Sequence, residues 1–144
     1  MTDAPDVPQF TRLDLDLVWR LGSDLVERCR RDALPVTISA RLGRQRVFHA
    51  ALPGTSADND SWVDRKLRVV AHFGVPSLQV EELVARTGRD LHRDFGLDPA
   101  RYAAAGGAVP LLVAGVLAGG LAVSGLASAE DHRLAVEALQ RFCS

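Results

Sequence analysis

The spacing of hydrophobic and polar residues changes several times along the chain, and each change marks a new element of secondary structure. The first pattern is helical, with apolar positions at Leu15, Val18, Leu25, Val26 and Cys29, and it continues as far as Ala33. Thr11 precedes this stripe as a candidate cap, and Asp14 stands where a carboxylate favours the free amides of a first turn. Phe10 is placed to pack onto Leu15. We therefore predict a first helix that begins just after Thr11.

Two pairs of apolar segments predict two β-hairpins. Residues 36–42 and 46–52 flank the polar tip Gly43-Arg44-Gln45, and residues 109–113 and 116–124 flank Ala114-Gly115. The second pair lies within residues 108–126, an uncharged stretch close to the ~20 residues that a membrane helix needs. Pro110 and four glycines would weaken such a helix, and its flanks lack the basic asymmetry that orients membrane helices. We therefore predict a hairpin and no membrane span.

Two helices are predicted between the hairpins. Asn59 and Asp60 are candidate caps for the first, whose stripe contains Trp62, Lys66, Val69 and Phe73, and Gly74 and Pro76 end it. Ser77 is a candidate cap for the second, whose stripe contains Val80, Leu83, Val84, Leu91 and Phe95, although Gly88 interrupts it.

The remaining signals complete an α+β pattern. Asp98-Pro99 predicts a short helical turn that runs to Gly106-Gly107. Residues 128–131 form a capping pattern for a last helix lined by Ala135, Ala138, Leu139 and Phe142. The order is α-ββ-α-α-ββ-α, and hairpins separated by helices predict an antiparallel sheet flanked by helices.

Composition and charge narrow the classes of protein. The length of 144 residues predicts a single domain over residues 12–144, and the polar start of the chain predicts a disordered tail over residues 1–11. A net charge of −1 provides no net positive electrostatic field to attract nucleic acid. Cys29 and Cys143 suggest no disulfide framework, so we expect a cytoplasmic protein. Lys66 is the only lysine.

Three blocks of residues then resemble a known pattern. They are Asn59-Asp60-Ser61-Trp62 with Arg65-Lys66, Gly96-Leu97-Asp98-Pro99 with Tyr102, Gly106-Gly107 and Pro110, and Val123-Ser124-Gly125-Leu126 with Asp131-His132. The chain resembles the uncharacterised branch of the haem-degrading-domain family, which is related to the HbpS and GlcG proteins. The resemblance implies a profilin-like α+β fold, assembly into homo-oligomers, and haem or another tetrapyrrole as a candidate ligand. Fold transfers between relatives better than function does.

Histidines are the candidate metal ligands, and each has a structural alternative. His49 lies on a predicted strand and is either a haem ligand or a structural histidine of the sheet. His132 begins the last helix, where the positive helix end favours its neutral form, so it either binds a metal or hydrogen-bonds to the turn at residues 124–126. Ser124, Asp131 and His132 could also form a hydrolase triad, but the chain has no GxSxG motif.

Two functional hypotheses follow. In the first, the chain is a homo-oligomeric protein that binds a small molecule in a pocket formed by Trp62, Arg65, Lys66, Gly106, Gly107, Ser124 and His132. His72, Arg65 and Arg68 form a basic ridge that either binds ligand carboxylates or is simply solvated. In the second hypothesis, the same motifs build subunit contacts of a non-catalytic interaction module. No coherent nucleophile and base are present, so we assign no catalytic residue and expect neither nucleic-acid nor membrane partners.

Overall fold

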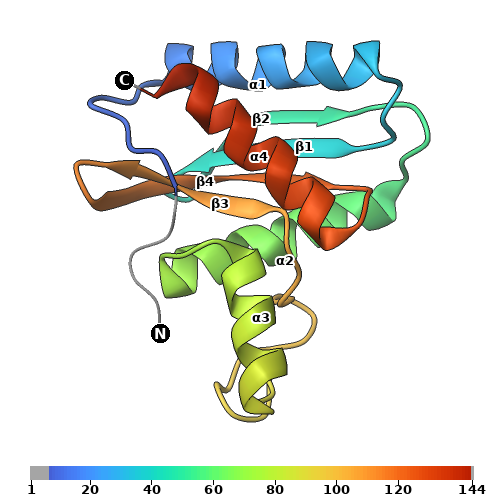
Figure 1. Cartoon of the computed structure of the whole chain (residues 1–144), viewed down its shortest axis with the longest axis vertical. Coiled ribbons are helices and arrows are strands. Elements are labelled where there is room, and N and C mark those ends of the chain that lie inside the picture. Colours follow the sequence, from blue (N-terminus) through green and yellow to red (C-terminus); the bar gives the residue numbers. More distant parts are fainter. Residues whose placement is uncertain (1–6, 144) are drawn as a thin grey trace.

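Two hairpins form the sheet of this protein, and helices cover both faces of the sheet (Figure 1). The computed structural model describes residues 7–143. Its elements are α1 (Leu15–Arg31), β1 (Thr37–Leu42), β2 (Gln45–Ala51), α2 (Ala57–Phe73), α3 (Ser77–Thr87), β3 (Ala108–Val113), β4 (Val116–Ser124) and α4 (Ser128–Phe142). The predicted order of helices and hairpins is confirmed, except for the short turn after α3.

The sheet is antiparallel throughout, with the strand order β2-β1-β4-β3. The two hairpins meet through their inner strands, since Thr37 of β1 pairs with Ser124 of β4 and the register continues to Leu42 and Gly119. The first four residues of β1 and the last five residues of β4 are buried, as are the first five residues of β3. The predicted α+β, profilin-like class is confirmed.

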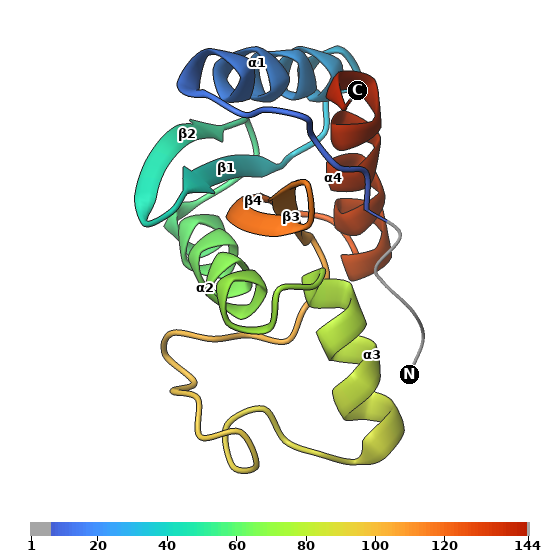
Figure 2. The same cartoon turned by 90° about the vertical axis from the view of Figure 1, so that its left-hand side faces the viewer.

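Alternation along the inner strands gives the sheet two different faces. Helices α1 and α4 cover one face, and α2 covers the other, with α3 and the long loop after it lying beyond α2 (Figure 2). The main core lies beneath α1 and α4 and includes Leu21, Leu25, Ile38, Leu111, Leu121 and Leu139. Beneath α2, the sheet presents small residues such as Ala108 and Ala122 to Val63, Leu67 and Val70. Small side chains allow α2 to approach the strands closely.

The N-terminal segment differs from the prediction. Helix α1 begins at Leu15, and Asp14 is its cap, because Asp14 Oδ1 accepts a hydrogen bond from the Leu17 amide at 2.8 Å. Leu15 is 57% exposed, so it does not pack with Phe10. Phe10 is instead buried, and its amide donates to the carbonyl of Leu112 at 2.8 Å. Within the predicted tail, Gln9 and Phe10 lie against the edge of β3, and the first six residues of that tail lie outside the described residues.

The caps and the loop after α3 also differ from the prediction. The cap of α2 is Ser56, and Asn59 occupies the third helical position, where its side chain accepts a hydrogen bond from the Ser56 amide at 3.0 Å. Helix α3 ends at Gly88, whose φ of 70° is left-handed. Leu91 lies beyond the helix but still packs with Val69 and Val80.

The segment that follows Asp98 forms one hydrogen-bonded turn, in which Arg101 and Tyr102 donate to the Asp98 carbonyl, and no helix is assigned there. The uncharged stretch at residues 108–126 forms the β3–β4 hairpin. Within residues 7–143, no helix is both long and apolar enough to span a membrane.

Candidate functional site

Helix α2 positions two cavities, one beside its first half and one beside its second half. Val63 and Val70 fix its orientation because both are buried against the sheet. Lys66 lies one turn from each of them, so the helical period directs its side chain inward as well. Arg68 and His72 lie along the other side of the helix and line the second cavity.

The first cavity has a volume of about 320 Å³ and contains a buried ion pair. Lys66 Nζ donates to Asp131 Oδ2 at 3.2 Å and to the Val123 carbonyl at 3.0 Å. The two side chains are only 4% and 2% exposed. Burial lowers the pKa of Lys66 and raises the pKa of Asp131, because each charged form loses its water.

Asp131 is held by the backbone as well as by Lys66. Its carboxylate accepts hydrogen bonds from the Leu126 amide at 3.0 Å and the Gly125 amide at 3.3 Å. The sequence assigned Asp131 to a capping pattern with Ser128, but the cap position of α4 is Ala127, which makes no side-chain cap bond. The carboxylate is directed away from the amides of its own helix because the turn at residues 124–126 and Lys66 supply its partners.

Two glycines allow the loop before β3 to pass close to this pair. A side chain at Gly107 would overlap the Val123 carbonyl and approach Lys66 Nζ to 2.8 Å, and its φ of 135° disfavours any other residue. A side chain at Gly106 would meet the Ser128 carbonyl at 2.8 Å. Glycine at both positions therefore lets the backbone of this loop pass close to Lys66 and to the start of α4.

Polar side chains form the rest of the first cavity. Asn59 Nδ2 donates to Ser124 Oγ at 3.4 Å, and Trp62 Nε1 donates to Asp58 Oδ2 at 3.2 Å. Arg65 does not line the cavity but lies over the Trp62 ring, 4.2 Å from its centre. Of the residues named in the sequence analysis, Trp62, Lys66 and Ser124 line this cavity, and Gly107 lies beside Lys66 Nζ.

His132 does not join this group. It follows Asp131 on α4, and its charge interacts with Glu82 of α3. Burial lowers the pKa of His132, and its Nδ1 is buried with no hydrogen-bond partner among the described residues. Asp131 is committed to Lys66, so the residues of the hypothetical hydrolase triad are not arranged as a triad.

His49 lies on the α2 side of the outer hairpin and is enclosed by polar partners. Its Nε2 is 3.2 Å from Asp60 Oδ1, and its Nδ1 is 3.2 Å from Ser39 Oγ and 3.3 Å from Arg46 Nη1. Both ring nitrogens are therefore engaged within the protein. Among residues 7–143, no cluster of three or more histidine, cysteine or acidic side chains is arranged to hold a metal ion.

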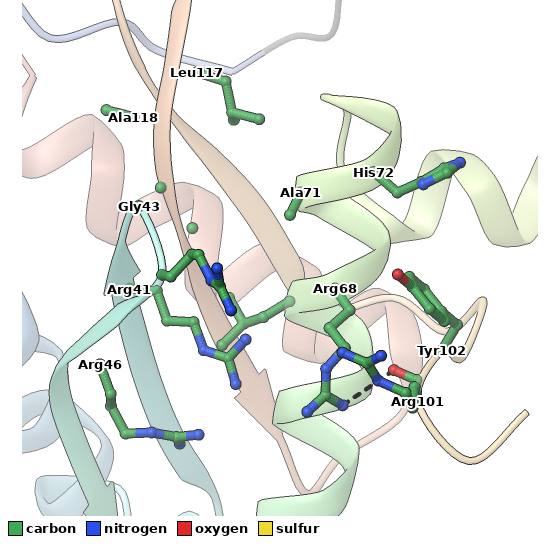
Figure 3. Close-up of a pocket in the computed structure, with 14 residues that line it drawn as sticks. Arg41, Gly43, Arg46, Arg68, Ala71, His72, Arg101, Tyr102, Leu117 and Ala118 are labelled. Carbon is green, nitrogen blue, oxygen red and sulfur yellow. Dashed lines mark hydrogen bonds between the residues drawn. The ribbon is translucent and has the colours of Figure 1, made fainter. Parts of the chain in front are cut away.

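The second cavity is a cationic cleft of about 640 Å³ between the β1–β2 tip, the second half of α2 and the loop after α3 (Figure 3). We call it the arginine cleft, after Arg41, Arg44, Arg46, Arg68 and Arg101, which line it together with His72 and Tyr102. Its apolar lining comes from Leu67, Ala71, Leu117 and Ala118. No carboxylate is among the described residues that line it.

The positive charge of the arginine cleft is only partly neutralised. Asp64 of α2 pairs with both Arg41, at 3.1 Å, and Arg46. Burial lowers the pKa of Arg41, and the nearby Asp64 carboxylate opposes that change. Arg68 Nη1 donates to the carbonyl of Arg101 at 3.2 Å, which ties the loop to α2 (Figure 3). A carboxylate pairs with guanidinium groups in bidentate fashion, so this arrangement favours an anionic ligand.

Sequence reasoning found part of the arginine cleft and missed the rest. Arg68 and His72 were in the predicted basic ridge, but the other arginines were not assigned. The concentration of Arg41, Arg44 and Arg46 at one hairpin tip was a usable signal. A second usable signal concerns the first cavity. Lys66 is the lone lysine in an apolar helical stripe, and a buried lysine requires a carboxylate partner such as Asp131.

Known proteins resemble this chain over nearly all of its length. The family model described as haem degrading protein HbpS-like matches residues 13–140. The UPF0303 protein SCO2848 of Streptomyces coelicolor is 48% identical over 134 residues, which are 92% of this chain and 85% of that protein. The solved structure of Ybr137w protein has a TM-score of 0.83 at 26% identity and covers 94% of this chain and 81% of that chain.

A further solved structure, a PduOC:heme complex, has a TM-score of 0.77 at 20% identity and covers 89% of this chain and 93% of that chain. At that identity it shows the shared fold alone. The family match, by contrast, extends over nearly all of the described residues and includes both cavities. The chain belongs to the family of HbpS-like haem degrading proteins.

Proposed function

We propose that this protein binds a tetrapyrrole that carries carboxylates, with haem as the candidate, in the arginine cleft. The observation that carries the proposal is the group of five arginines without a lining carboxylate. The volume of about 640 Å³ lies within the range of roughly 300–1,000 Å³ typical of small-molecule sites. The family description and the haem bound by PduOC support the ligand class.

The residues of the cleft fit the chemistry of haem. Arg68 and Arg101 would bind the propionates, and the apolar strip of Leu67, Ala71 and Leu117 would contact the ring. His72 would supply a nitrogen to the iron, since His49 already uses both ring nitrogens and His132 lies outside both cavities. Bound haem would supply an iron centre able to take a further ligand or an electron.

A spectroscopic titration tests this proposal. Hemin added to the wild-type protein should give a saturable shift of the Soret band. Arg68→Gln and Arg101→Gln should each weaken the affinity about tenfold to a hundredfold, because a hydrogen bond to a charged group contributes roughly 1.5–3 kcal/mol. Arg133→Gln is the matched control, since Arg133 lies on α4, pairs with Glu130 and Glu137, and lines neither cavity.

Two further measurements separate the ring from the iron. Iron-free protoporphyrin should bind to the wild-type protein and to His72→Ala alike, while His72→Ala should change the hemin spectrum. A linear, unsaturable hemin response, or equal affinities for wild type and Arg68→Gln, would contradict the proposal.

Self-assembly is a second proposal, and it retains the interaction-module hypothesis. Leu15 and Trp19 lie one turn apart on α1 and are 57% and 60% exposed. A large apolar pair on a helix surface is typical of a contact between proteins. Sedimentation at micromolar concentration should show a homo-oligomer that Trp19→Ser weakens and Arg133→Gln does not. A monomeric wild-type protein would contradict this proposal.

A further inference from the structure

The single lysine of this chain is buried, while every other basic side chain is arginine. Arginine retains its proton and pairs with carboxylates through a rigid fork, so it suits a purely structural ion pair. Lysine is a primary amine that becomes a nucleophile when it loses its proton. The only side chain capable of amine chemistry therefore lies on the wall of the first cavity.

The surroundings of Lys66 place a proton acceptor in direct contact with its amine. Its Nζ lies between Asp131 Oδ2 at 3.2 Å and the Val123 carbonyl at 3.0 Å, with the backbone of Gly107 beside it. Glu81 is a further acidic neighbour. Burial lowers the pKa of Lys66 and raises the pKa of Asp131, while the charge and hydrogen bond of each partner oppose these changes, so the transfer of one proton from Nζ to Oδ2 converts the ion pair into a neutral amine and a carboxylic acid. An amine beside a protonated carboxyl is the arrangement that imine formation requires.

The cavity walls define the chemical class of the ligand. Asn59, Ser124 and Ser128 provide an amide and two hydroxyls, which can donate to and accept from hydroxyl groups. Asp58 and Asp131 make the cavity acidic, which disfavours an anionic keto acid. The volume of about 320 Å³ limits the ligand to a short molecule.

We propose that Lys66 captures short, neutral hydroxyaldehydes as an imine in the first cavity. After Nζ has passed one proton to Asp131, its lone pair forms a bond with the carbonyl carbon while the carbonyl oxygen takes that proton from Asp131. The nitrogen then returns a proton to Asp131, which gives a neutral carbinolamine. Protonation of the new hydroxyl by Asp131 expels water and leaves a protonated imine opposite the Asp131 carboxylate. The product restores the original ion pair of one cation and one carboxylate.

Reductive trapping of the full-length protein tests the proposal. The protein is incubated with glycolaldehyde and cyanoborohydride, and the modified residues are mapped by peptide mass spectrometry. The α-amino group of Met1 is the internal reference, because Lys66 is the only lysine. Lys66 should be modified faster than the α-amino group of Met1. The rate at Lys66 should saturate as the glycolaldehyde concentration rises, and it should fall when glyoxylate replaces glycolaldehyde. Modification confined to Met1, or modification of Lys66 only in urea, would overturn the proposal.

Variants of the cavity wall test whether the cavity positions the aldehyde. Ser124→Ala and Ser128→Ala should each slow the trapping of glycolaldehyde at Lys66 roughly threefold to tenfold, which corresponds to one lost hydrogen bond. Ser61→Ala is the matched control, because Ser61 is exposed on α2 and lines neither cavity. Trapping rates equal to that of the wild-type protein in both wall variants would overturn the proposal. If Ser124→Ala does not fold, the wild-type protein decides the question, because a Lys66 trapping rate that does not saturate with glycolaldehyde would overturn the proposal. The arginine cleft shares no lining residue with this cavity, so Arg68→Gln should leave the trapping unchanged.

Discussion

The Lys66–Asp131 pair should dominate the electrostatic contribution to stability, and a double-mutant cycle measures this. Removing one partner from a buried ion pair costs about 3–5 kcal/mol, a large share of the roughly 5–15 kcal/mol that stabilises a typical domain. The loss of stability in Lys66→Met should lie at the lower end of this range, because Asp131 can take a proton and keep its hydrogen bonds to the Gly125 and Leu126 amides. Asp131→Leu should lie at the upper end, because it leaves those two amides without a partner and leaves the ammonium without a counter-charge, bonded only to the Val123 carbonyl.

The double variant Lys66→Met/Asp131→Leu should be more stable than the sum of the single losses predicts. Neither remaining side chain carries a charge that must be desolvated, so the coupling should be about 2 kcal/mol or more. Urea unfolding followed by circular dichroism gives the four free energies. The exposed pair Arg133–Glu137 is the control, and its removal should cost less than about 1 kcal/mol. Single losses below about 1 kcal/mol, or additivity within about 0.5 kcal/mol, would refute the reasoning.

Three further predictions concern other parts of the chain. Hydrogen bonds from Arg141 lower the pKa of Asp24. Their contribution to the free energy of unfolding is therefore present above the usual carboxyl pKa and is lost as the pH falls through the lowered pKa. Asp24→Asn should therefore cost about 0.5–1 kcal/mol at neutral pH, reduced by salt, and nothing in strong acid, as unfolding curves at several pH values will show. Gly119→Ala should destabilise the protein by about 1–3 kcal/mol or more, measured by its thermal midpoint, because the new methyl would overlap the Arg41 carbonyl at the β1–β4 junction. Burial raises the pKa of Cys29 to about 11, so a thiol reagent should label Cys29 only when urea unfolds the protein. Rapid labelling of the folded wild-type protein that is lost in Cys29→Ser would contradict the reasoning.

Local signals in the sequence predicted most of the secondary structure. The tips at Gly43 and Ala114-Gly115 fixed both hairpins, since short polar or glycine-containing breaks between apolar segments are strong turn signals. Helix starts were less certain, because Thr11 and Asp14 are both good caps and only the packing selects one. The strand order depends on the pairing of β1 with β4, which are far apart in the sequence.

The candidate sites were predictable only where they lie on one helix or in a recognisable motif. Trp62 and Lys66 belong to one stripe of α2, so the helical period placed them together. Arg41 and Arg101 approach α2 from two other segments, and no local pattern reports that approach. His132 lines neither cavity, whereas its neighbour Asp131 takes the position beside Lys66.

The segment around Phe10 gives the sheet two unequal edges. Phe10 forms a bridge to Val113, and Gln9 accepts a hydrogen bond from the Gly115 amide at 2.7 Å, so the β3 edge is partly occupied by the chain itself. Among the described residues, no strand lies beside the β2 edge. Growth of a fibre by strand addition needs two free edges, one to receive and one to present. If copies associate through their strands, the association therefore stops at a closed pair and does not polymerise.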